Sequence, residues 1–322
     1  MTAARYRVLL TDRAWPDSSI EREILGVVGA ELIEAPDTRE STLQALAREV
    51  DAIAANWAPV TESVIRQTTR CQIISRTGIG LDNIAVNVAT QLEIPVTNVP
   101  DYCVGEVADH ALALLLACAR NITYFHARTK RGEYRLQNAP SMRRLAGQTL
   151  GLFGLGRIGQ ALAGMARGLG LVVIAHTASG NDHGVGCPMV TRDELLTRSD
   201  FISLHAPLTP DTRHVFGMAA LEQMKNSAYL INTSRGGLID HAALWHALQT
   251  NQIAGAALDV FEPEPPDLSH PLFQDERVIV TPHAAFVSIE SLIELRTRVA
   301  RQIADRLSGR RPENVVNPQV LG

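Results

Sequence analysis

The sequence predicts an α/β protein of two doubly wound domains, each with a parallel sheet between layers of helices. Three observations lead to this prediction. The chain has 322 residues, more than one hydrophobic core usually holds. Strand-like apolar runs alternate with helical ones along its length, and strands joined by helical crossovers pair in parallel. A composition of 46% hydrophobic and 20% charged residues is typical of globular proteins.

The alternation begins at the N-terminal end of the chain. A strand in YRVLLTD is followed by a helix and a second strand within residues 21–35. Further helices are predicted in STLQALAREV and in TESVIRQT, where Thr61 is the N-cap, and further strands in DAIAAN, CQIISRTG and IPVTNVP. We expect these strands to form the first parallel sheet.

The middle of the chain is predicted to link the two domains. The segment EVADHALALLLACAR is apolar on nearly all sides, so we expect a helix that is buried between layers and joins the domains. Residues 129–145 are polar and basic, which indicates a loop and a surface helix. A strand, a helix and a strand then follow in QTLGLFGLGRIGQALAGMARGLGLVVIAHT.

The C-terminal part continues the same pattern. Strands are predicted in DFISLHAPL, SAYLINTS, IAGAALDVF and VIVTPHAA, and helices begin after the N-caps Asp240 and Ser288. The proline-rich segment FEPEPPDLSHP is expected to lack regular structure. We therefore expect one discontinuous domain of residues 1–99 and 288–322, and a second domain of residues 100–287.

Gly154, Gly156 and Gly159 form the sequence GLGRIG between a predicted strand and a predicted helix. In a dinucleotide-binding turn, the first glycine permits the tight turn and the second lets the backbone approach the pyrophosphate. The third lets the helix pack closely on the strand. The N-terminus of the helix then attracts the anion. Because strand, helix and next strand are all present, the segment predicts a dinucleotide site in a Rossmann-like domain.

The strand after this turn ends at His176 and Thr177, where proteins that prefer NAD usually have an acidic residue that binds the ribose 2′-hydroxyl. The acid is absent here, which removes repulsion against a 2′-phosphate. Thr177 and Ser179 offer hydroxyl donors, but no arginine lies nearby in the sequence. The pattern favours NADP, and NAD stays an alternative.

Arg235, Glu264 and His283 follow three separate strand-like runs after the glycine turn. The carboxyl ends of parallel strands face the ligand crevice, so these side chains are expected to converge. Reduction of a 2-oxo acid needs a cation for the carboxylate and carbonyl, a proton donor, and a group that keeps the donor charged. Arginine, histidine and glutamate supply these functions in that order.

Four motifs, GLGRIG, LINTSRGGLID, ALDVFEPEP and VIVTPHAA, occur in this order. Together they resemble the D-2-hydroxyacid dehydrogenase family over residues 6–318, and the ending TPHAAFVSIESLIELRTRVA is most similar to its branch of C-terminal-binding proteins. The resemblance implies hydride transfer between a nicotinamide cofactor and a small 2-oxo or 2-hydroxy acid of D configuration, such as glyoxylate or hydroxypyruvate. It implies that His283 is the general acid and base, Glu264 its partner and Arg235 the substrate binder.

The resemblance also implies the cofactor contacts. Arg157 and Ile158 would offer backbone amides to the pyrophosphate, while Asp259 and the backbone of Thr233 would hold the nicotinamide carboxamide. The loop along the adenosine side is matched by His205, Ala206, Pro207 and Thr212.

In the discontinuous domain, SRTGIGLDN matches the family loop whose backbone amides, at Gly78 and Ile79, receive the substrate carboxylate. This implies that residues 1–99 and 288–322 bind substrate, that residues 100–287 bind the dinucleotide, and that the active site lies in the cleft between the domains. Arg76 matches a basic substrate-binding position of the C-terminal-binding branch, and a salt bridge to Asp82 or a neighbour is its alternative role. Phe286 either forms a wall of the pocket or is a plain core aromatic.

Composition and charge limit the classes of molecule that the chain is expected to bind. The net charge of −4 and the lack of a basic stripe argue against nucleic acid. Apolar runs are too short for a membrane span, and the N-terminus is too polar for a signal peptide, so a cytoplasmic location is expected. Cysteine and histidine spacing predicts no metal site. The resemblance implies a homodimer that forms through the dinucleotide-binding domain.

Two other functions stay open at the level of sequence. A dinucleotide-sensing binding protein of the corepressor type usually carries disordered tails, and this chain has essentially none beyond residues 316–322. A phosphite-type dehydrogenase carries the same three catalytic residue types. Formate is disfavoured because Glu264 stands where formate dehydrogenases typically have Gln.

Overall fold

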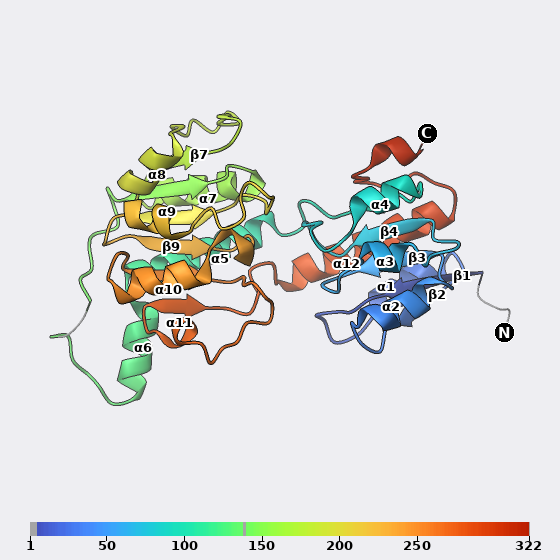
Figure 1. The fold of residues 1–322 in the computed structure, drawn as a ribbon, viewed down its shortest axis with the longest axis horizontal. Helices are drawn as coiled ribbons and strands as arrows, with labels where there is room; N and C mark the ends of the chain where they lie inside the picture. The colour runs from blue at the N-terminus through green and yellow to red at the C-terminus, as the bar shows by residue number, and fades with distance from the viewer. Residues whose placement is uncertain (1–4, 138–139, 322) are drawn as a thin grey trace. The chain divides into compact units, whose positions relative to one another are not determined.

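The fold is known from a computed structural model, which describes residues 5–137 and 140–321. Contacts between Cα atoms divide the chain into two compact units, unit 1 (Met1–Tyr102 and Ser288–Gly322) and unit 2 (Cys103–Val287). Each unit contains one sheet of parallel strands flanked by helices (Figure 1). The predicted fold class, a pair of doubly wound α/β units, is therefore confirmed.

The sheet of unit 1 has five strands in the order β2-β1-β3-β4-β5. The strands are β1 (Tyr6–Leu10), β2 (Ala30–Glu34), β3 (Ala52–Ala55), β4 (Ile73–Arg76) and β5 (Val96–Thr97). The helices are α1 (Ser19–Gly26), α2 (Glu40–Ala47), α3 (Glu62–Ile65), α4 (Val86–Gln91) and α12 (Ile289–Leu307), followed by the short 3-10 helix η2 (Pro318–Leu321). Apolar residues of α2, α3 and α4 share one core with the sheet, whereas α1 packs against α12, which also contacts β3 and β4.

Helix α12 is joined to the N-terminal part of unit 1 by buried polar contacts. Arg296 donates from Nε and Nη2 to the two carboxylate oxygens of Glu21, both at 2.8 Å. Gln302 is fully buried, and its amide accepts from Ser75 Oγ at 2.8 Å and donates to the carbonyl of Asn98 at 2.9 Å. Because buried charges and amides are costly without partners, these contacts specify how α12 packs.

The sheet of unit 2 has six strands in the order β11-β10-β9-β8-β6-β7. The strands are β6 (Thr149–Phe153), β7 (Val172–His176), β8 (Phe201–Leu204), β9 (Tyr229–Asn232), β10 (Gly255–Leu258) and β11 (Val278–Val280). The helices are α5 (Val104–Ala119), α6 (Ile122–Lys130), α7 (Arg157–Gly168), α8 (Arg192–Arg198), α9 (Met218–Gln223), α10 (His241–Gln249) and α11 (Pro271–Gln274), with the 3-10 helix η1 (Gly236–Leu238).

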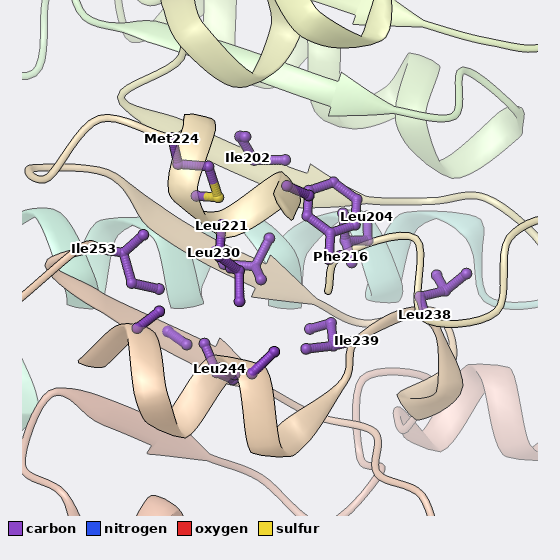
Figure 2. Close-up of a cluster of buried hydrophobic side chains, with 14 of the residues drawn as sticks. Ile202, Leu204, Phe216, Leu221, Met224, Leu230, Leu238, Ile239, Leu244 and Ile253 are labelled. Carbon is purple, nitrogen blue, oxygen red and sulfur yellow. The ribbon is translucent and has the colours of Figure 1, made fainter. Parts of the chain in front are cut away.

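Two apolar cores cover the two faces of this sheet. One contains residues of α8, α9 and α10; Figure 2 shows Ile202, Leu230 and Leu244 of this core gathered between the strands and α10. The other contains residues of α5 and α7. The chain leaves β6 toward β7 on one side and returns to β8 on the other, so the order of strands reverses between β6 and β8. Ligands of open α/β sheets bind at such a reversal.

The three predicted N-caps are confirmed. The side chain of Thr61 accepts from the amide of Val64, and that of Asp240 accepts from the amides of Ala242 and Ala243. Ser288 forms a reciprocal capping box with Ser291 at the start of α12. Each side chain satisfies a backbone donor that the helix itself leaves unpaired.

The surface helix predicted within residues 129–145 is wrong in position. Helix α6 lies earlier, at Ile122–Lys130, and the described residues from 131 to 148 are turns and loop. The helix ends there because Gly132 adopts a left-handed conformation with φ of 87° and its amide donates to the carbonyl of Thr129.

Among the described residues, no helix is long and apolar enough to cross a membrane.

Candidate active site

Three predicted side chains lie at the carboxyl ends of adjacent strands in unit 2. Arg235 follows β9, Glu264 follows β10 and His283 follows β11. The side chains of His283 and Glu264 are in contact, since Nδ1 of His283 donates to Oε2 of Glu264 at 2.8 Å. The other carboxylate oxygen of Glu264 accepts from the amide of Phe261 at 2.8 Å. This geometry assigns Nδ1 as the donor to Glu264 and directs Nε2 away from the carboxylate.

Glu264 is held in its ionised form. Burial alone raises the pKa of this carboxyl, but the hydrogen bond and charge of His283, the amide of Phe261 and the charge of Arg235 together outweigh burial. The pKa of Glu264 therefore lies below its ordinary value. A carboxylate that stays charged can stabilise a protonated imidazole beside it.

The charge of Arg235 acts on Glu264 because two backbone segments touch. A Cβ atom on Gly236 would lie only 2.0 Å from the carbonyl carbon of Phe261, so only glycine allows this approach. Arg235 donates from Nη1 to the carbonyl of Ser234 at 2.7 Å, and its own carbonyl accepts from the side chain of Asn232 at 2.8 Å. These bonds fix the turn that carries Arg235, and the close approach at Gly236 places it against the loop that carries Glu264.

Phe286 lies beside His283. Its ring centroid is 6.0 Å from that of His283, and the two rings are nearly perpendicular at 87°. Phe286 is half-buried. Its contact with His283 is compatible with a wall of the pocket, which stays a prediction.

The glycine turn after β6 has the form that a dinucleotide requires. Gly154 has φ of 101°, and a Cβ there would lie 2.6 Å from the carbonyl carbon of His205. A Cβ on Gly159 would lie 2.6 Å from the carbonyl oxygen of Gly154. A Cβ on Gly156, by contrast, would meet no atom within 4 Å, so protein packing does not explain this glycine. Open space at the N-terminus of α7, beside the amides of Arg157 and Ile158, fits a pyrophosphate.

The end of β7 presents two polar side chains. The ring of His176 stacks on Phe153 with centroids 5.6 Å apart, and its Nδ1 lies 3.1 Å from the carbonyl oxygen of Val190. A carbonyl only accepts, so Nδ1 carries the hydrogen. Thr177 Oγ1 lies 3.4 Å from Ser179 Oγ. The two hydroxyls predicted to replace the missing acid are thus close together.

The other predicted cofactor positions also lie at this edge of the sheet. His205, directly after β8, contacts Ser203 Oγ through Nε2 at 2.9 Å. The carbonyl of Ala206 accepts from Ser234 Oγ, and that of Pro207 from Thr212 Oγ1, both at 2.7 Å. Thr233 has a buried hydroxyl that makes no hydrogen bond within the described residues, which leaves a polar group for a bound molecule.

Burial lowers the pKa of His205 from 6.5 to about 4. Between these values the unfolded chain binds more protons here than the folded chain, so the free energy of unfolding falls as the pH falls from 6.5 to 4. We expect a loss of up to about 3 kcal/mol. Urea unfolding at several pH values should show a shallower dependence for His205→Gln than for the unchanged protein. If the free energy of unfolding depends on pH equally in the two proteins, His205 is not the source of the pH dependence.

Asp259, predicted to hold the carboxamide, is fully buried after β10. Its carboxylate accepts hydrogen bonds from the amides of Ala284 and Ala285, next to His283 in the chain. Two neighbours, Thr281 and His110, were not predicted as site residues. The only signal for His110 in the sequence is a polar side chain within an apolar helix.

Within the described residues, no group of three or more His, Cys, Asp or Glu side chains is arranged to hold a metal ion.

Unit 1 holds the predicted substrate loop after β4. Arg76 is buried and donates from Nε to the carbonyl of Gly80 at 3.0 Å and from Nη1 to the carbonyls of Ala55, at 3.3 Å, and Thr77. A Cβ on Gly78, which has φ of 151°, would lie 3.0 Å from Arg76 Nη1. The guanidinium therefore lies beneath the loop and binds its carbonyls, and a contact with substrate stays a prediction.

Ile79 is the second amide predicted to receive a carboxylate. Its carbonyl accepts from the side chain of Asn98 at 2.7 Å, so both ends of this loop segment are anchored. The loop and the trio of Arg235, Glu264 and His283 belong to different units. The predicted meeting of the two across a cleft stays a prediction.

Comparisons with known proteins identify the family of the chain. Residues 112–285, more than half of the chain, match the family model described as D-isomer specific 2-hydroxyacid dehydrogenase, NAD binding domain. A glyoxylate reductase of Korarchaeum cryptofilum is 36% identical over 89% of each chain. The crystal structure of a glyoxylate reductase from Paecilomyes thermophila superposes with a TM-score of 0.88 at 28% identity, and covers 99% of this chain and 100% of that one.

A D-3-phosphoglycerate dehydrogenase of Methanocaldococcus jannaschii is 39% identical over 97% of this chain. The alignment covers 59% of that relative, so the chain spans little more than half of its length. These comparisons confirm the predicted family and the nicotinamide class of cofactor. The finer resemblance to the C-terminal-binding branch stays a prediction.

Proposed function

Because the chain belongs to the D-isomer specific 2-hydroxyacid dehydrogenase family, we propose that it reduces small 2-oxo acids such as glyoxylate or hydroxypyruvate to D-2-hydroxy acids. The observation that carries this proposal is the 2.8 Å hydrogen bond between His283 Nδ1 and Glu264 Oε2, with Arg235 on the adjoining strand end. These groups supply the proton, the compensating charge and the cation that the reaction needs.

Each of the three side chains has a defined task. When bound, the nicotinamide supplies or accepts the hydride. His283 donates a proton from Nε2 to the substrate oxygen during reduction and accepts it during oxidation. Glu264 orients the ring through Nδ1 and stabilises the imidazolium. Arg235 binds the carboxylate and polarises the carbonyl, which places negative charge on the oxygen next to the acid.

The cofactor domain is unit 2 and the substrate domain is unit 1 in this proposal. Gly154, Gly156 and Gly159 form the pyrophosphate turn, and the buried hydroxyl of Thr233 offers a polar contact to the bound dinucleotide. The amides of Gly78 and Ile79 receive the substrate carboxylate. The C-terminal segment that begins at Ser288 returns the chain to the substrate domain.

The decisive experiment is a screen of the purified protein against 2-oxo acids. Glyoxylate, hydroxypyruvate, pyruvate and 3-phosphohydroxypyruvate are each offered with NADH and with NADPH, and phosphite is offered with both oxidised cofactors. We expect reduction of at least one 2-oxo acid, with a D product on chiral chromatography. Dinucleotide binding without turnover would instead indicate a sensing protein, and reduction of NAD or NADP by phosphite would indicate the phosphite-type enzyme.

We propose that NADP is preferred over NAD, because β7 ends at His176 and the next residue, Thr177, is not an acid. Thr177→Asp is expected to reverse this preference, since a carboxylate there binds the 2′-hydroxyl of NAD and repels a 2′-phosphate. We expect a change of about tenfold or more in the ratio of kcat/KM for NADPH to that for NADH. An unchanged ratio would place the discriminating residue elsewhere. Thr197→Val, on the exposed side of α8, is the control.

Arg76 is expected to support substrate binding through the loop above it. Arg76→Lys loses the planar fork that binds several carbonyls, so the amides of Gly78 and Ile79 are less well ordered. We expect the KM for the 2-oxo acid to rise about tenfold, for the loss of one to two hydrogen bonds, with a smaller change in kcat. Arg66→Lys, an exposed partner of Glu62, is the control. A fall in kcat alone would contradict this role.

We propose a homodimer that forms through unit 2 and a cytoplasmic location. Large apolar side chains are exposed on this unit, with Ile122 56%, Tyr134 91% and Leu136 76% accessible, and burial against a second copy would remove them from water. None of the four cysteines is in a disulfide, as a reducing compartment requires. Light scattering coupled to gel filtration measures the mass, and a monomer would contradict the dimer.

A further inference from the structure

The turn that carries His283 is held by one buried carboxylate. Oδ1 of Asp259 accepts from the amide of Ala284 at 2.9 Å, and Oδ2 accepts from the amide of Ala285 at 3.0 Å. The amide of His283 donates to the backbone carbonyl of Asp259 at 2.8 Å. Asp259 thus binds three successive amides of the turn, one through its backbone and two through its side chain.

The backbone of this turn depends on such support. His283 has φ of 52°, in the left-handed region that residues with a side chain rarely adopt. Such a conformation persists only where the surroundings fix it, and it is common at functional sites. The direction of the imidazole therefore depends on the hydrogen bonds around Asp259.

Two side chains complete these hydrogen bonds. The hydroxyl of Thr281 donates to Oδ1 of Asp259 at 2.6 Å, and Nε2 of His110, on α5, lies 3.1 Å from the same hydroxyl and 3.5 Å from Oδ1. A threonine hydroxyl has one hydrogen, and an ionised carboxylate only accepts. The hydrogen between His110 and Thr281 must therefore be on Nε2 of His110.

The result is a directed chain of donors that ends on a carboxylate. His110 donates to Thr281, Thr281 donates to Asp259, and Asp259 receives the amides beyond His283. A fully buried carboxylate is costly unless its oxygens are satisfied, so loss of either donor favours rearrangement of the turn. His110 comes to the turn from a distant part of the chain, because it is 171 positions from Thr281.

We propose that His110 and Thr281 are positioning residues, which act through Asp259 to aim the imidazole of His283. This inference rests on the proposed function of His283 as the proton donor. It differs from a role of Asp259 toward the nicotinamide carboxamide, because neither His110 nor Thr281 needs to touch cofactor or substrate.

Two substitutions remove the donors, and two keep them. Thr281→Val replaces the hydroxyl by a methyl of similar size, and Thr281→Ser keeps it. His110→Leu removes Nε2, while His110→Gln places an amide donor near the same point. Thr197→Val is the control for loss of a hydroxyl in unit 2, since Thr197 binds only carbonyls of its own helix and lies outside the site.

We expect kcat to fall about tenfold or more in Thr281→Val and His110→Leu, because a small displacement of a catalytic group is costly. The Kd for the reduced cofactor should change less than threefold. Thr281→Ser and His110→Gln should stay within about threefold of the unchanged protein in kcat. A pH profile of kcat that shifts only in the Val and Leu variants further separates positioning from general destabilisation.

Hydrogen–deuterium exchange of residues 281–287 tests the inference without turnover. In the absence of cofactor and substrate, we expect faster exchange there in Thr281→Val and His110→Leu only. Unchanged exchange would overturn the inference, as would a loss confined to cofactor affinity. If the unchanged protein reduces none of the acids, the proposed function fails while exchange still decides the role of the two residues. Should Thr281→Val not fold, His110→Leu, on a partly exposed side chain, gives the answer alone.

Discussion

His283→Asn is expected to lower kcat for 2-oxo acid reduction by about a thousandfold, within the range that a general acid contributes. Asparagine tolerates the left-handed backbone that His283 adopts at φ of 52°, so the turn should keep its form. Its side-chain amide can still donate to Glu264, but no group remains at the position of Nε2 to protonate the substrate. Steady-state kinetics with the best 2-oxo acid measure the effect.

The binding of cofactor is the internal control for this variant. The Kd for the reduced dinucleotide should change less than threefold, because the pyrophosphate turn lies at a different strand end. Glu264→Gln keeps an oxygen that can accept from Nδ1 but loses the charge, so we expect a smaller fall in kcat, about tenfold to a hundredfold. A His283→Asn variant with nearly unchanged kcat would remove His283 from the chemistry.

Gly154→Ala is expected to lose both stability and cofactor binding, whereas Gly156→Ala is expected to lose cofactor binding alone. At Gly154 a Cβ would lie 2.6 Å from the backbone of His205, at φ of 101°, so the substitution both crowds and strains the turn. We expect a loss of about 3 kcal/mol or more in the free energy of unfolding, together with loss of cofactor binding. Urea unfolding and fluorescence titration with NADH and NADPH measure the two effects.

At Gly156 the same methyl group meets no protein atom within 4 Å, and φ is an ordinary −70°. The free energy of unfolding should stay the same or rise by up to about 1 kcal/mol, because alanine restricts the unfolded chain. The Kd for the dinucleotide should nevertheless rise tenfold or more, since the methyl occupies space where the pyrophosphate meets the backbone. If Gly156→Ala binds cofactor normally, the turn does not cradle a phosphate.

Much of the fold was accessible from the sequence because periodicity is a local property. The strand and helix order, the caps at Thr61, Asp240 and Ser288, and the glycine turn all depend on residues within a few positions of one another. The position of α6 was missed because its end depends on the conformation of Gly132, which the composition of the surrounding loop obscures.

The contact between His283 and Glu264 followed from motifs and from the rule that parallel strand ends share an edge. The hydrogen bonds of Asp259, Thr281 and His110 around this contact could not be predicted in the same way. Arg76 can point toward a ligand or toward backbone carbonyls near its own loop. Which of these it contacts depends on the direction of a buried side chain, which the sequence does not give. The proposed role of His110 requires α5 to lie against the end of β11, a relation between segments far apart in sequence that no local pattern contains.

The way α12 packs on the sheet of unit 1 has a consequence for synthesis on the ribosome. Residues 1–102 emerge before the helix whose Arg296 pairs with Glu21, 275 positions away, so the nascent N-terminal segment exposes an apolar face until translation has passed unit 2. The continuous unit 2 can reach its native state first. Unit 1 can fold fully only after α12 has been synthesised, so its N-terminal segment is the part of the nascent chain that chaperones are expected to bind.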